Sequence, residues 1–309
     1  MSETRIRMAI QKSGRLSERS VDLLEKCGID FSWRKNTLLN RCRDFPLDLM
    51  LVRDDDIPEY VRTGVCDLGI VGENVIAEHR PPDSGRGDSK IPARRRIKVV
   101  RELGFGRCRL SLAVPKETAY DGVEGLRGSN IATSYPVILG DFLAEKGVDA
   151  SIIELTGSVE IAPALAIAEA ICDLVSTGST LESNGLREVE TIFTSQAVLV
   201  TAEGPAPKGG GVDDGKERTI LRLARRIDGV LKAAKSKYIM MNAPADKVEA
   251  IRDILPGMEA PSVLPLLGQT DRVAIHAVAT EDVFWDTMNR LKDAGAASIL
   301  VVPIEKIID

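Results

Sequence analysis

A strand-like apolar segment, Ala170–Val175, runs into a cluster of small polar residues: Ser176, Thr177, Gly178, Ser179 and Thr180. A helix can begin behind this cluster, so backbone N–H groups, hydroxyls and the helix dipole would all favour an anion there. Gly178 lets the backbone come close to a ligand, and the Asp173 carboxylate can accept hydrogen bonds from two sugar hydroxyls. The pattern predicts a cradle for ribose 5-phosphate, with an ordinary N-capped helix start as the alternative.

A second glycine turn follows the first predicted strand. It consists of Gln11, Lys12, Ser13, Gly14 and Arg15. Its two cations would suit anionic phosphates held at the end of a strand. A solvated turn with ordinary surface charges is the alternative.

Two further segments combine turn residues with charge. Arg53 precedes Asp54–Asp56, three carboxylates that could hold a divalent ion, although acids are also favoured at a helix N-terminus. We favour the second interpretation, with Asp56 as the N-cap of a helix that begins at Ile57-Pro58. Gly157-Ser158-Val159-Glu160 is another glycine-serine turn with a carboxylate beside it, and we expect a helix over 162–170 behind it.

Strands and helices alternate in the part of the chain that carries these segments. Apolar runs predict strands over 5–10, 47–52, 65–71, 110–114 and 130–133, with helices from about 16, from 57 and over 135–146. This alternation predicts an α/β fold with parallel strands.

The sequence also contains an internal echo. Gly64–Gly72 parallels Ala170–Gly178: Cys, Asp, Leu and the final Gly coincide. Two similar α/β lobes with a cleft between them would explain the echo, and chance agreement over nine residues is the alternative.

The C-terminal part reads as a separate domain. A glycine-rich and proline-containing stretch, 202–215, predicts a loop or linker. Beyond a helix over 218–234 the predicted order is β-α-β-β-α-β, which is the split ferredoxin-like pattern. By analogy with other domains of this pattern, we expect it to bind a small regulator.

Composition limits the class of protein. The 309 residues are 44% hydrophobic and 28% charged, with a net charge of −5, which fits a globular protein and no nucleic-acid surface. No apolar run approaches the roughly 20 residues that span a bilayer. With no secretory signal, five scattered cysteines and two histidines, we expect a cytoplasmic protein with reduced thiols.

These motifs resemble, in order, those of the ATP phosphoribosyltransferase family. The segments that carry the resemblance are Arg7–Leu16, Val52–Pro58, Asp67–Asn74, Cys108–Leu112, Ile131–Pro136, Gly157–Glu160, Asp173–Leu181 and Ser236–Met241. Because it extends into the C-terminal domain, the chain is similar to the long, histidine-regulated form. A non-catalytic solute-binding or sensor protein would share two lobes, but it would not explain two phosphate-type turns.

The resemblance implies an architecture and a reaction. It implies two lobes like those of periplasmic binding proteins, lobe I being 1–106 with 183–202 and lobe II being 107–182. A linker, 203–217, would lead to a ferredoxin-like regulatory domain, 218–309. The implied reaction transfers phosphoribosyl from phosphoribosyl pyrophosphate to N1 of the adenine of ATP and releases pyrophosphate, with Mg²⁺ as cofactor. Dimers that assemble to hexamers are implied as well.

The same resemblance assigns roles to residues. It makes Arg53, Asp173 and Glu160 catalytic, with no metal ligand identified. The substrate-binding residues would be Gln11, Lys12, Ser13, Gly14, Arg15, Glu73, Asp173, Ser176, Thr177, Gly178, Ser179 and Thr180. Histidine would bind near Asn242, Ser262, Val278 and Ser298, between domains of neighbouring chains, and AMP is a further expected ligand.

Overall fold

The computed structural model describes residues 4–31, 37–81, 95–204, 214–255, 257 and 260–308. They form two compact units, Met1–Leu221 and Arg222–Asp309. Most of the predicted loop at 202–215 lies outside the described residues. No helix in the described part of the chain is long and apolar enough to cross a membrane.

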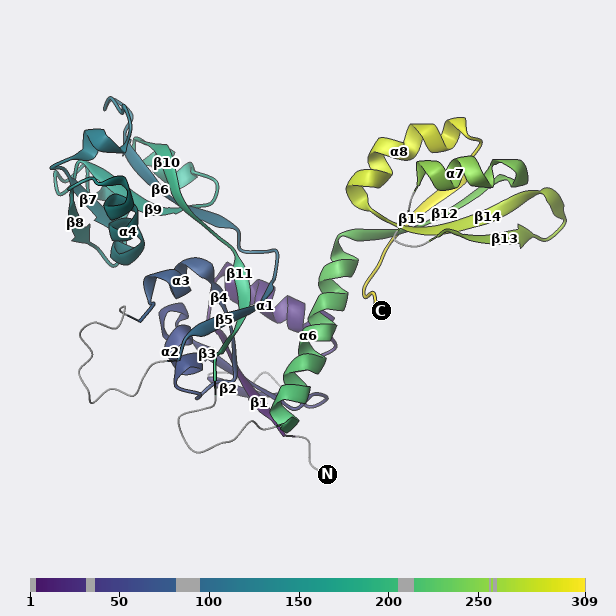
Figure 1. Ribbon diagram of the computed structural model, residues 1–309, viewed down its shortest axis with the longest axis horizontal. Coiled ribbons are helices and arrows are strands. Elements are labelled where there is room, and N and C mark those ends of the chain that lie inside the picture. Colours follow the sequence, from purple (N-terminus) through teal and green to yellow (C-terminus); the bar gives the residue numbers. More distant parts are fainter. Residues whose placement is uncertain are drawn as a thin grey trace. The chain divides into compact units, whose positions relative to one another are not determined.

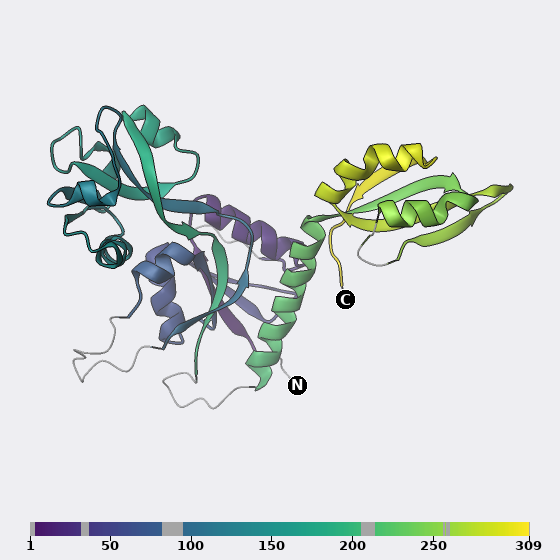
Figure 2. The ribbon, with the colours of Figure 1, turned by 45° about the horizontal axis from the view of Figure 1, so that its top comes forward.

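Six of the described strands form the first sheet of the first unit (Figure 1). Their order is β2 (Leu39–Arg41), β3 (Leu47–Val52), β1 (Ile6–Gln11), β4 (Leu68–Gly72), β11 (Ala197–Ala202) and β5 (Ile97–Glu102). β3, β1 and β4 are parallel, and β11 runs antiparallel to both of its neighbours. Helices α2 (Ile57–Arg62) and α3 (Glu73–Glu78) pack on the face that carries Ala9 and Val198. Figures 1 and 2 show α1 (Arg15–Lys26) on the other side of this sheet.

Five more described strands form the second sheet of this unit. Their order is β10 (Leu186–Ser195), β6 (Cys108–Pro115), β9 (Ala170–Val175), β7 (Asn130–Thr133) and β8 (Ser151–Glu154). β9, β7 and β8 are parallel, whereas β6 is antiparallel to both β9 and β10. Helix α4 (Pro136–Lys146) packs through Ile138 and Leu139 against the core of this sheet. It ends at Gly147 in the left-handed conformation that glycine favours, which agrees with the predicted end of the helix at 146.

Each sheet is the core of one lobe, and the chain crosses between the lobes twice. It passes from β5 to β6 and returns from β10 to β11, and the two crossings hydrogen-bond to each other where the Ala197 N–H donates to the Phe105 carbonyl at 2.8 Å. The sequence assigns 183–202 to lobe I, but β10 lies in the lobe II sheet. The chain therefore re-enters lobe I at 197, because β10 pairs along its length with β6.

The internal echo falls on corresponding strands. β4 and β9 are each the third strand of a parallel trio, and each also pairs with an antiparallel strand on its other side. The two lobes thus have the same local topology around the echo.

One helix predicted in lobe II does not form. In place of a helix over 162–170, a short 3-10 helix, η3 (Val159–Ile161), is followed by turns until β9 begins at Ala170. Ala166 has φ of 54°, a left-handed conformation that interrupts a helix, and the extended β9 takes the last of these residues.

Helices from the two lobes bond to each other. The Glu78 carboxylate, at the end of α3, accepts the backbone N–H groups of Val137 (2.9 Å) and Ile138 (3.1 Å) in the first turn of α4. These N–H groups have no partner within their own helix. Asn74 of α3 donates to the Tyr135 hydroxyl at 3.2 Å just before α4. A residue of lobe I therefore caps a helix of lobe II.

The second unit is a ferredoxin-like domain. Four described strands form its antiparallel sheet in the order β13 (Ser262–Leu266), β14 (Gln269–Thr280), β12 (Ser236–Pro244) and β15 (Ala297–Pro303). Helices α7 (Val248–Ile254) and α8 (Glu281–Asp293) lie on one face of that sheet (Figure 2). There they cover Ile239, Met241 and Ile275. This is the predicted β-α-β-β-α-β order.

The boundary between the units lies inside a helix. Helix α6 (Asp214–Ala234) begins within the predicted linker and before the predicted start at 218. Its first turns belong to the first unit, where Lys216 forms an ion pair with Asp67 at 2.8 Å and Thr219 donates to the Thr4 carbonyl at 3.4 Å. Because of these contacts, the boundary between the two units lies at 221–222 and not at the predicted 217–218.

The cap that Glu78 provides gives a test of stability. Replacing Glu78 with Gln removes one of two acceptor oxygens and the negative charge at the start of α4. We expect the free energy of unfolding to fall by about 1–2 kcal/mol, measured by urea unfolding. Glu145→Gln, at an exposed position of the same helix, is the control; equal effects of both changes would contradict the capping role.

Candidate functional site

The predicted residues of lobe I lie at one edge of its sheet. Parallel strands end on the same side, so Arg53 after β3, the turn 11–15 after β1, and Glu73 after β4 come together. The Lys12 N–H donates to the Val52 carbonyl at 2.8 Å, and the Gln11 side chain donates to Asp54 at 3.4 Å. The two strand ends are thereby fixed side by side.

The acidic triplet after Arg53 forms a 3-10 helix, η1 (Asp54–Asp56), that leads into α2. Asp56 occupies the N-cap position as predicted, but in the described structure its side chain makes no cap hydrogen bond. Asp54 is half-buried, and burial is the main reason that its pKa is raised, with the charge of Asp55 adding to it. Among the described residues, no group of three His, Cys, Asp or Glu side chains could hold a metal ion.

The predicted residues of lobe II lie at the corresponding edge of its sheet. Asp173 is on β9, two residues before its end, and Glu160 is in η3, beyond β8. Burial raises the pKa of Asp173, and the negative charge of Glu160 raises it further. The Leu174 N–H donates to the Asp173 carboxylate at 2.7 Å, which fixes one of its oxygens. The structure therefore brings these two carboxylates together.

The polar loop after β9 has the expected conformation. Gly178 has φ of 85°, a left-handed conformation that favours glycine, and α5 (Ser179–Ser183) follows it. The Thr177 and Ser179 hydroxyls are exposed and lie 3.1 Å apart. With only five residues, α5 adds little dipole, so the loop's own N–H groups and hydroxyls are the available anion donors.

The two edges meet at Tyr135. Burial is the main cause of the raised pKa of Tyr135, and the carboxylates of Asp173 in lobe II and of Asp54 and Asp55 in lobe I raise it further. Asn74 of lobe I donates to the phenol oxygen at 3.2 Å. This hydrogen bond joins the two edges directly.

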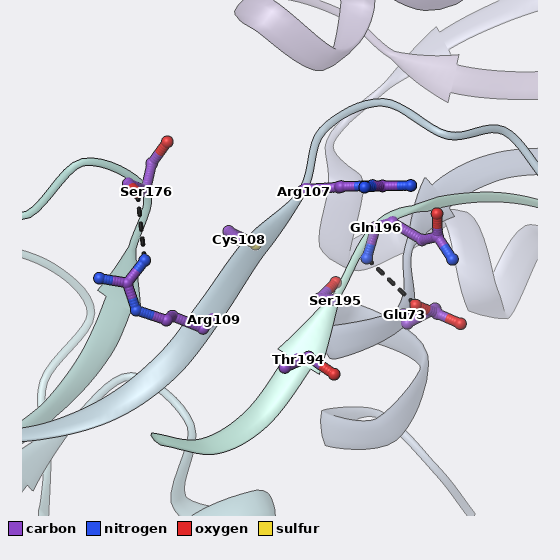
Figure 3. A pocket seen from close by; sticks show the side chains of 8 residues that line it. All are labelled: Glu73, Arg107, Cys108, Arg109, Ser176, Thr194, Ser195 and Gln196. Carbon is purple, nitrogen blue, oxygen red and sulfur yellow. Dashed lines mark hydrogen bonds between the residues drawn. The ribbon is translucent and has the colours of Figure 1, made fainter. Parts of the chain in front are cut away.

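A pocket of about 440 Å³ opens beside the crossings (Figure 3). Its lining residues are Glu73, Arg107, Cys108, Arg109, Ser176, Thr194, Ser195 and Gln196. Of these, Glu73 and Ser176 are predicted site residues, one from each lobe. The Glu73 carboxylate accepts the Gln196 N–H at 3.1 Å, and Arg109 donates to the Ser176 carbonyl at 3.2 Å.

Sequence reasoning missed Tyr135, Asn74 and Arg109 as parts of this site. Tyr135 follows β7 in a segment noted only for its family resemblance. The rule that parallel strands end at one edge would have placed it beside Asp173. The same rule would have placed Asn74, next to Glu73 after β4, at the edge of lobe I. Arg109 carries no such signal, because its importance depends on a contact with a residue 67 positions away.

The four predicted histidine positions lie on four different strands of the second unit. The register places Asn242 opposite Ala274 and Ala297, Ser262 opposite His276, and Val278 opposite Tyr238. Since Ile239 and Met241 face the helices, alternation puts Asn242, Ser262 and Val278 on the opposite face of the sheet. Ser298, with φ of 52°, lies at an irregularity beside Asn242. Along β14, however, Val278 lies four residues from Ala274, so the four positions are spread over that face.

Comparison with known families finds two matches that together span most of the chain. The model of the ATP phosphoribosyltransferase family (HisG) matches residues 53–229. The model described as the HisG C-terminal domain matches residues 233–306.

Comparison with solved structures points to the same family. A chain of the ATP phosphoribosyl transferase (HisG:HisZ) complex from Thermotoga maritima is 28% identical, with a TM-score of 0.56, over 72% of this chain and 98% of that one. A weaker likeness is a histidine kinase sensor domain similar to periplasmic binding proteins, at 12% identity and a TM-score of 0.45, over 74% of this chain and 91% of that one. Another is the VFT2 domain of Bordetella pertussis BvgS, at 11% identity and a TM-score of 0.43, over 71% of this chain and 86% of that one.

The partly buried carboxylate of Asp173 gives a prediction that separates stability from activity. Its folded pKa is raised, so ionising it costs more in the folded protein than in the unfolded one. That cost is absent below the ordinary carboxyl pKa, grows as pH rises through it, and is complete above the folded pKa. Asp173→Asn should therefore leave the protein equally stable or more stable at pH 7, with no gain at pH 3, while phosphoribosyl transfer is lost.

Urea unfolding at the two pH values and an assay of product formation measure both effects. A variant that is less stable at pH 7 but active would contradict the assignment of Asp173 as a partly buried functional carboxylate.

Proposed function

Because the chain belongs to the ATP phosphoribosyltransferase family, in its long form, we propose that the facing edges of its two lobes bind and orient the two substrates. The reaction moves a phosphoribosyl group from phosphoribosyl pyrophosphate to N1 of the adenine of ATP and releases pyrophosphate. It is the first step of histidine biosynthesis. The observation that carries the proposal is the pocket of about 440 Å³ that Glu73 of lobe I and Ser176 of lobe II line together.

Lobe II is proposed to hold the sugar phosphate. The free oxygen of Asp173 would accept hydrogen bonds from the ribose hydroxyls, since its other oxygen is occupied by the Leu174 N–H. Thr177, Gly178, Ser179 and Thr180, with the backbone of Ser176, would surround the 5-phosphate. The exposed hydroxyls of Thr177 and Ser179 support this role, because an O–H group can rotate to donate to a bound anion without movement of the backbone.

Lobe I is proposed to hold the phosphates of ATP and the leaving pyrophosphate. Lys12, Arg15 and Arg53 are the cations of its edge, and Gln11, Ser13 and Gly14 supply polar groups and backbone between them. Charge-assisted hydrogen bonds to phosphate are roughly twice as strong as neutral ones. Glu73, whose carboxylate also accepts the Gln196 N–H, would bind a substrate hydroxyl or amine.

The chemistry then depends on orientation and on charge. As the bond to pyrophosphate breaks, positive charge develops on the sugar ring and negative charge on the leaving group. Arg53 would stabilise the departing pyrophosphate, and the Asp173 and Glu160 carboxylates would stabilise the cationic ring. The adenine N1 is already a nucleophile, so no strong general base is required, and holding two anionic substrates in line can supply much of the acceleration.

Mg²⁺ is part of the proposal through the substrates. Mg²⁺ commonly takes one or two carboxylates together with substrate phosphates, not a cage built only of protein. The described residues fit that mode, because the Glu160 carboxylate lies at the edge of lobe II where the sugar phosphate is proposed to bind. The ion would neutralise charge on pyrophosphate as that group departs.

The second unit is proposed to bind histidine and to inhibit the reaction, with AMP as a further ligand of the enzyme. Asn242, Ser262 and Val278 are spread over one sheet face and Ser298 lies at the irregularity of the edge strand β15, which supports a pocket completed by another chain. A homo-oligomer, dimer to hexamer, would provide that chain. A cytoplasmic location belongs to the same proposal.

Loss of one hydroxyl tests the phosphate loop. Thr177→Val keeps the shape of the side chain and removes a donor. A hydrogen bond to a charged group contributes about 1.5–3 kcal/mol, so kcat/KM for phosphoribosyl pyrophosphate should fall by roughly 10- to 150-fold. The assay follows the absorbance of the N1-substituted adenine in the presence of Mg²⁺.

Ser183→Ala is the matched control, because Ser183 is exposed on α5 and donates to the Ser179 carbonyl. It should leave kcat/KM nearly unchanged. If the folded Thr177→Val enzyme is as active as the parent, the 5-phosphate binds elsewhere.

Regulation is tested at the irregularity in β15. Ser298→Leu places a bulky side chain where the histidine pocket is proposed. We expect activity without histidine to be retained and inhibition by millimolar histidine to be lost. Normal inhibition of the active variant would show that the pocket is misplaced, and a parent enzyme that ignores histidine would rule out the regulatory role.

A further inference from the structure

Arg109 lies on β6, between β9 and β10 in the sheet. Its side chain joins the proposed phosphate loop, which follows β9, to β10. One nitrogen of its guanidinium donates to the backbone carbonyl of Ser176 at 3.2 Å (Figure 3). Two others donate to the Glu188 carboxylate on β10, each at 2.5 Å. The loop is therefore linked through one side chain to β10.

The contact with Ser176 determines where the next N–H group points. In a trans peptide the carbonyl and the following N–H point in opposite directions. No described peptide bond is cis. While Arg109 holds the Ser176 carbonyl, the N–H of Thr177 must therefore point away from Arg109. That N–H belongs to the loop in which the 5-phosphate is proposed to bind.

Arg109 is itself held in place by a network on β6 and β10. Ser111, which is buried, donates to Glu188 at 2.8 Å, and Thr191 lies 3.2 Å from the Ser111 hydroxyl. The pairing of β10 with β6 has an irregularity between Glu188 and Glu190, so Glu188 lies at a break in the register. Both strands thus contribute to the position of the guanidinium.

The charge of Arg109 is already matched. Its guanidinium lowers the pKa of Glu188 through the hydrogen bonds that it donates, so Glu188 is a carboxylate at neutral pH. The ion pair is two-pronged and carries no net charge. An arginine that serves chiefly to bind phosphate directly would gain from an unpaired positive charge, and this one is neutralised.

We infer that Arg109, held by Glu188, is a positioning residue that orients the loop 176–180 for the 5-phosphate of phosphoribosyl pyrophosphate. The inference rests on the proposed function of that loop. It assigns neither Arg109 nor Glu188 a contact with the reacting atoms. Its expected effect is on binding of the sugar phosphate.

Glu188→Gln is the decisive variant, because the two possible roles of Arg109 predict opposite results. If Arg109 positions the loop, loss of the two-pronged pair loosens the guanidinium, and KM for phosphoribosyl pyrophosphate rises. If Arg109 binds phosphate directly, release from its partner makes its charge more available, and that KM falls or stays the same. We expect a rise of about tenfold, comparable with the loss of one strong hydrogen bond.

Arg109→Gln should give a similar rise, and Arg109→Lys should restore part of the affinity because lysine can still donate to the Ser176 carbonyl. In all three variants KM for ATP and kcat should stay within about twofold, as expected when uniform binding is lost. Arg187→Gln is the matched control. Arg187 is also on β10 and donates to a backbone carbonyl, that of Thr118, at 2.9 Å.

A second measurement does not depend on activity. Hydrogen exchange of the peptide that contains 173–183, in the full-length enzyme without substrates, should be faster in Glu188→Gln and Arg109→Gln and unchanged in Arg187→Gln. If Glu188→Gln folds and leaves both the exchange and KM unchanged, or lowers KM, the inference is wrong. If Arg109→Gln does not fold, Arg109→Lys and Glu188→Gln decide.

Thr177→Val distinguishes failure of this inference from failure of the proposed function. When Thr177→Val weakens use of phosphoribosyl pyrophosphate but Glu188→Gln does not, the loop binds phosphate and Arg109 does not position it. When Glu188→Gln speeds exchange but neither variant affects KM, the loop is positioned by Arg109 but does not bind the substrate.

Discussion

Parallel strands of one sheet all end at the same edge, and the site of this protein depends on that constraint. In lobe I the constraint brings together turns that are separated by about 20 to 60 residues, after β1, β3 and β4. In lobe II it does the same for the segments after β7, β8 and β9. Antiparallel strands could not have collected these polar ends at one edge.

The two connections between the lobes bring the strand edge of lobe I and the strand edge of lobe II together. β5 to β6 and β10 to β11 run side by side and hydrogen-bond at Ala197 and Phe105. Because β6 and β10 then pair with each other, lobe II is built on the strands that leave and re-enter lobe I. The pocket beside the crossings therefore includes residues of both lobes, such as Glu73 and Ser176.

The sequence was sufficient where local rules decide the structure. The glycine at 147 ends α4, the Ile57-Pro58 pair begins α2, and the echo between 64–72 and 170–178 falls on equivalent strands. It failed where distant contacts decide. Residues 162–170 have helical composition, yet Ala166 is left-handed and β9 takes the end of the segment. β10 belongs to lobe II only because β6 is there to pair with it, and Arg109 matters only because β9 ends beside β6.

Because Glu78 of lobe I caps α4 of lobe II, the stability of the first turn of α4 depends on how the two lobes are arranged. Two N–H groups in the first turn of α4 are satisfied by a carboxylate that α4's own lobe does not contain. Any hinge motion that separates α3 from α4 must return those groups to water or leave them unpaired, at a cost on the order of 1–3 kcal/mol. The end of α4 would fray as the lobes part. A ligand that bridges the lobes would therefore favour the same arrangement of α3 and α4 as this cap does.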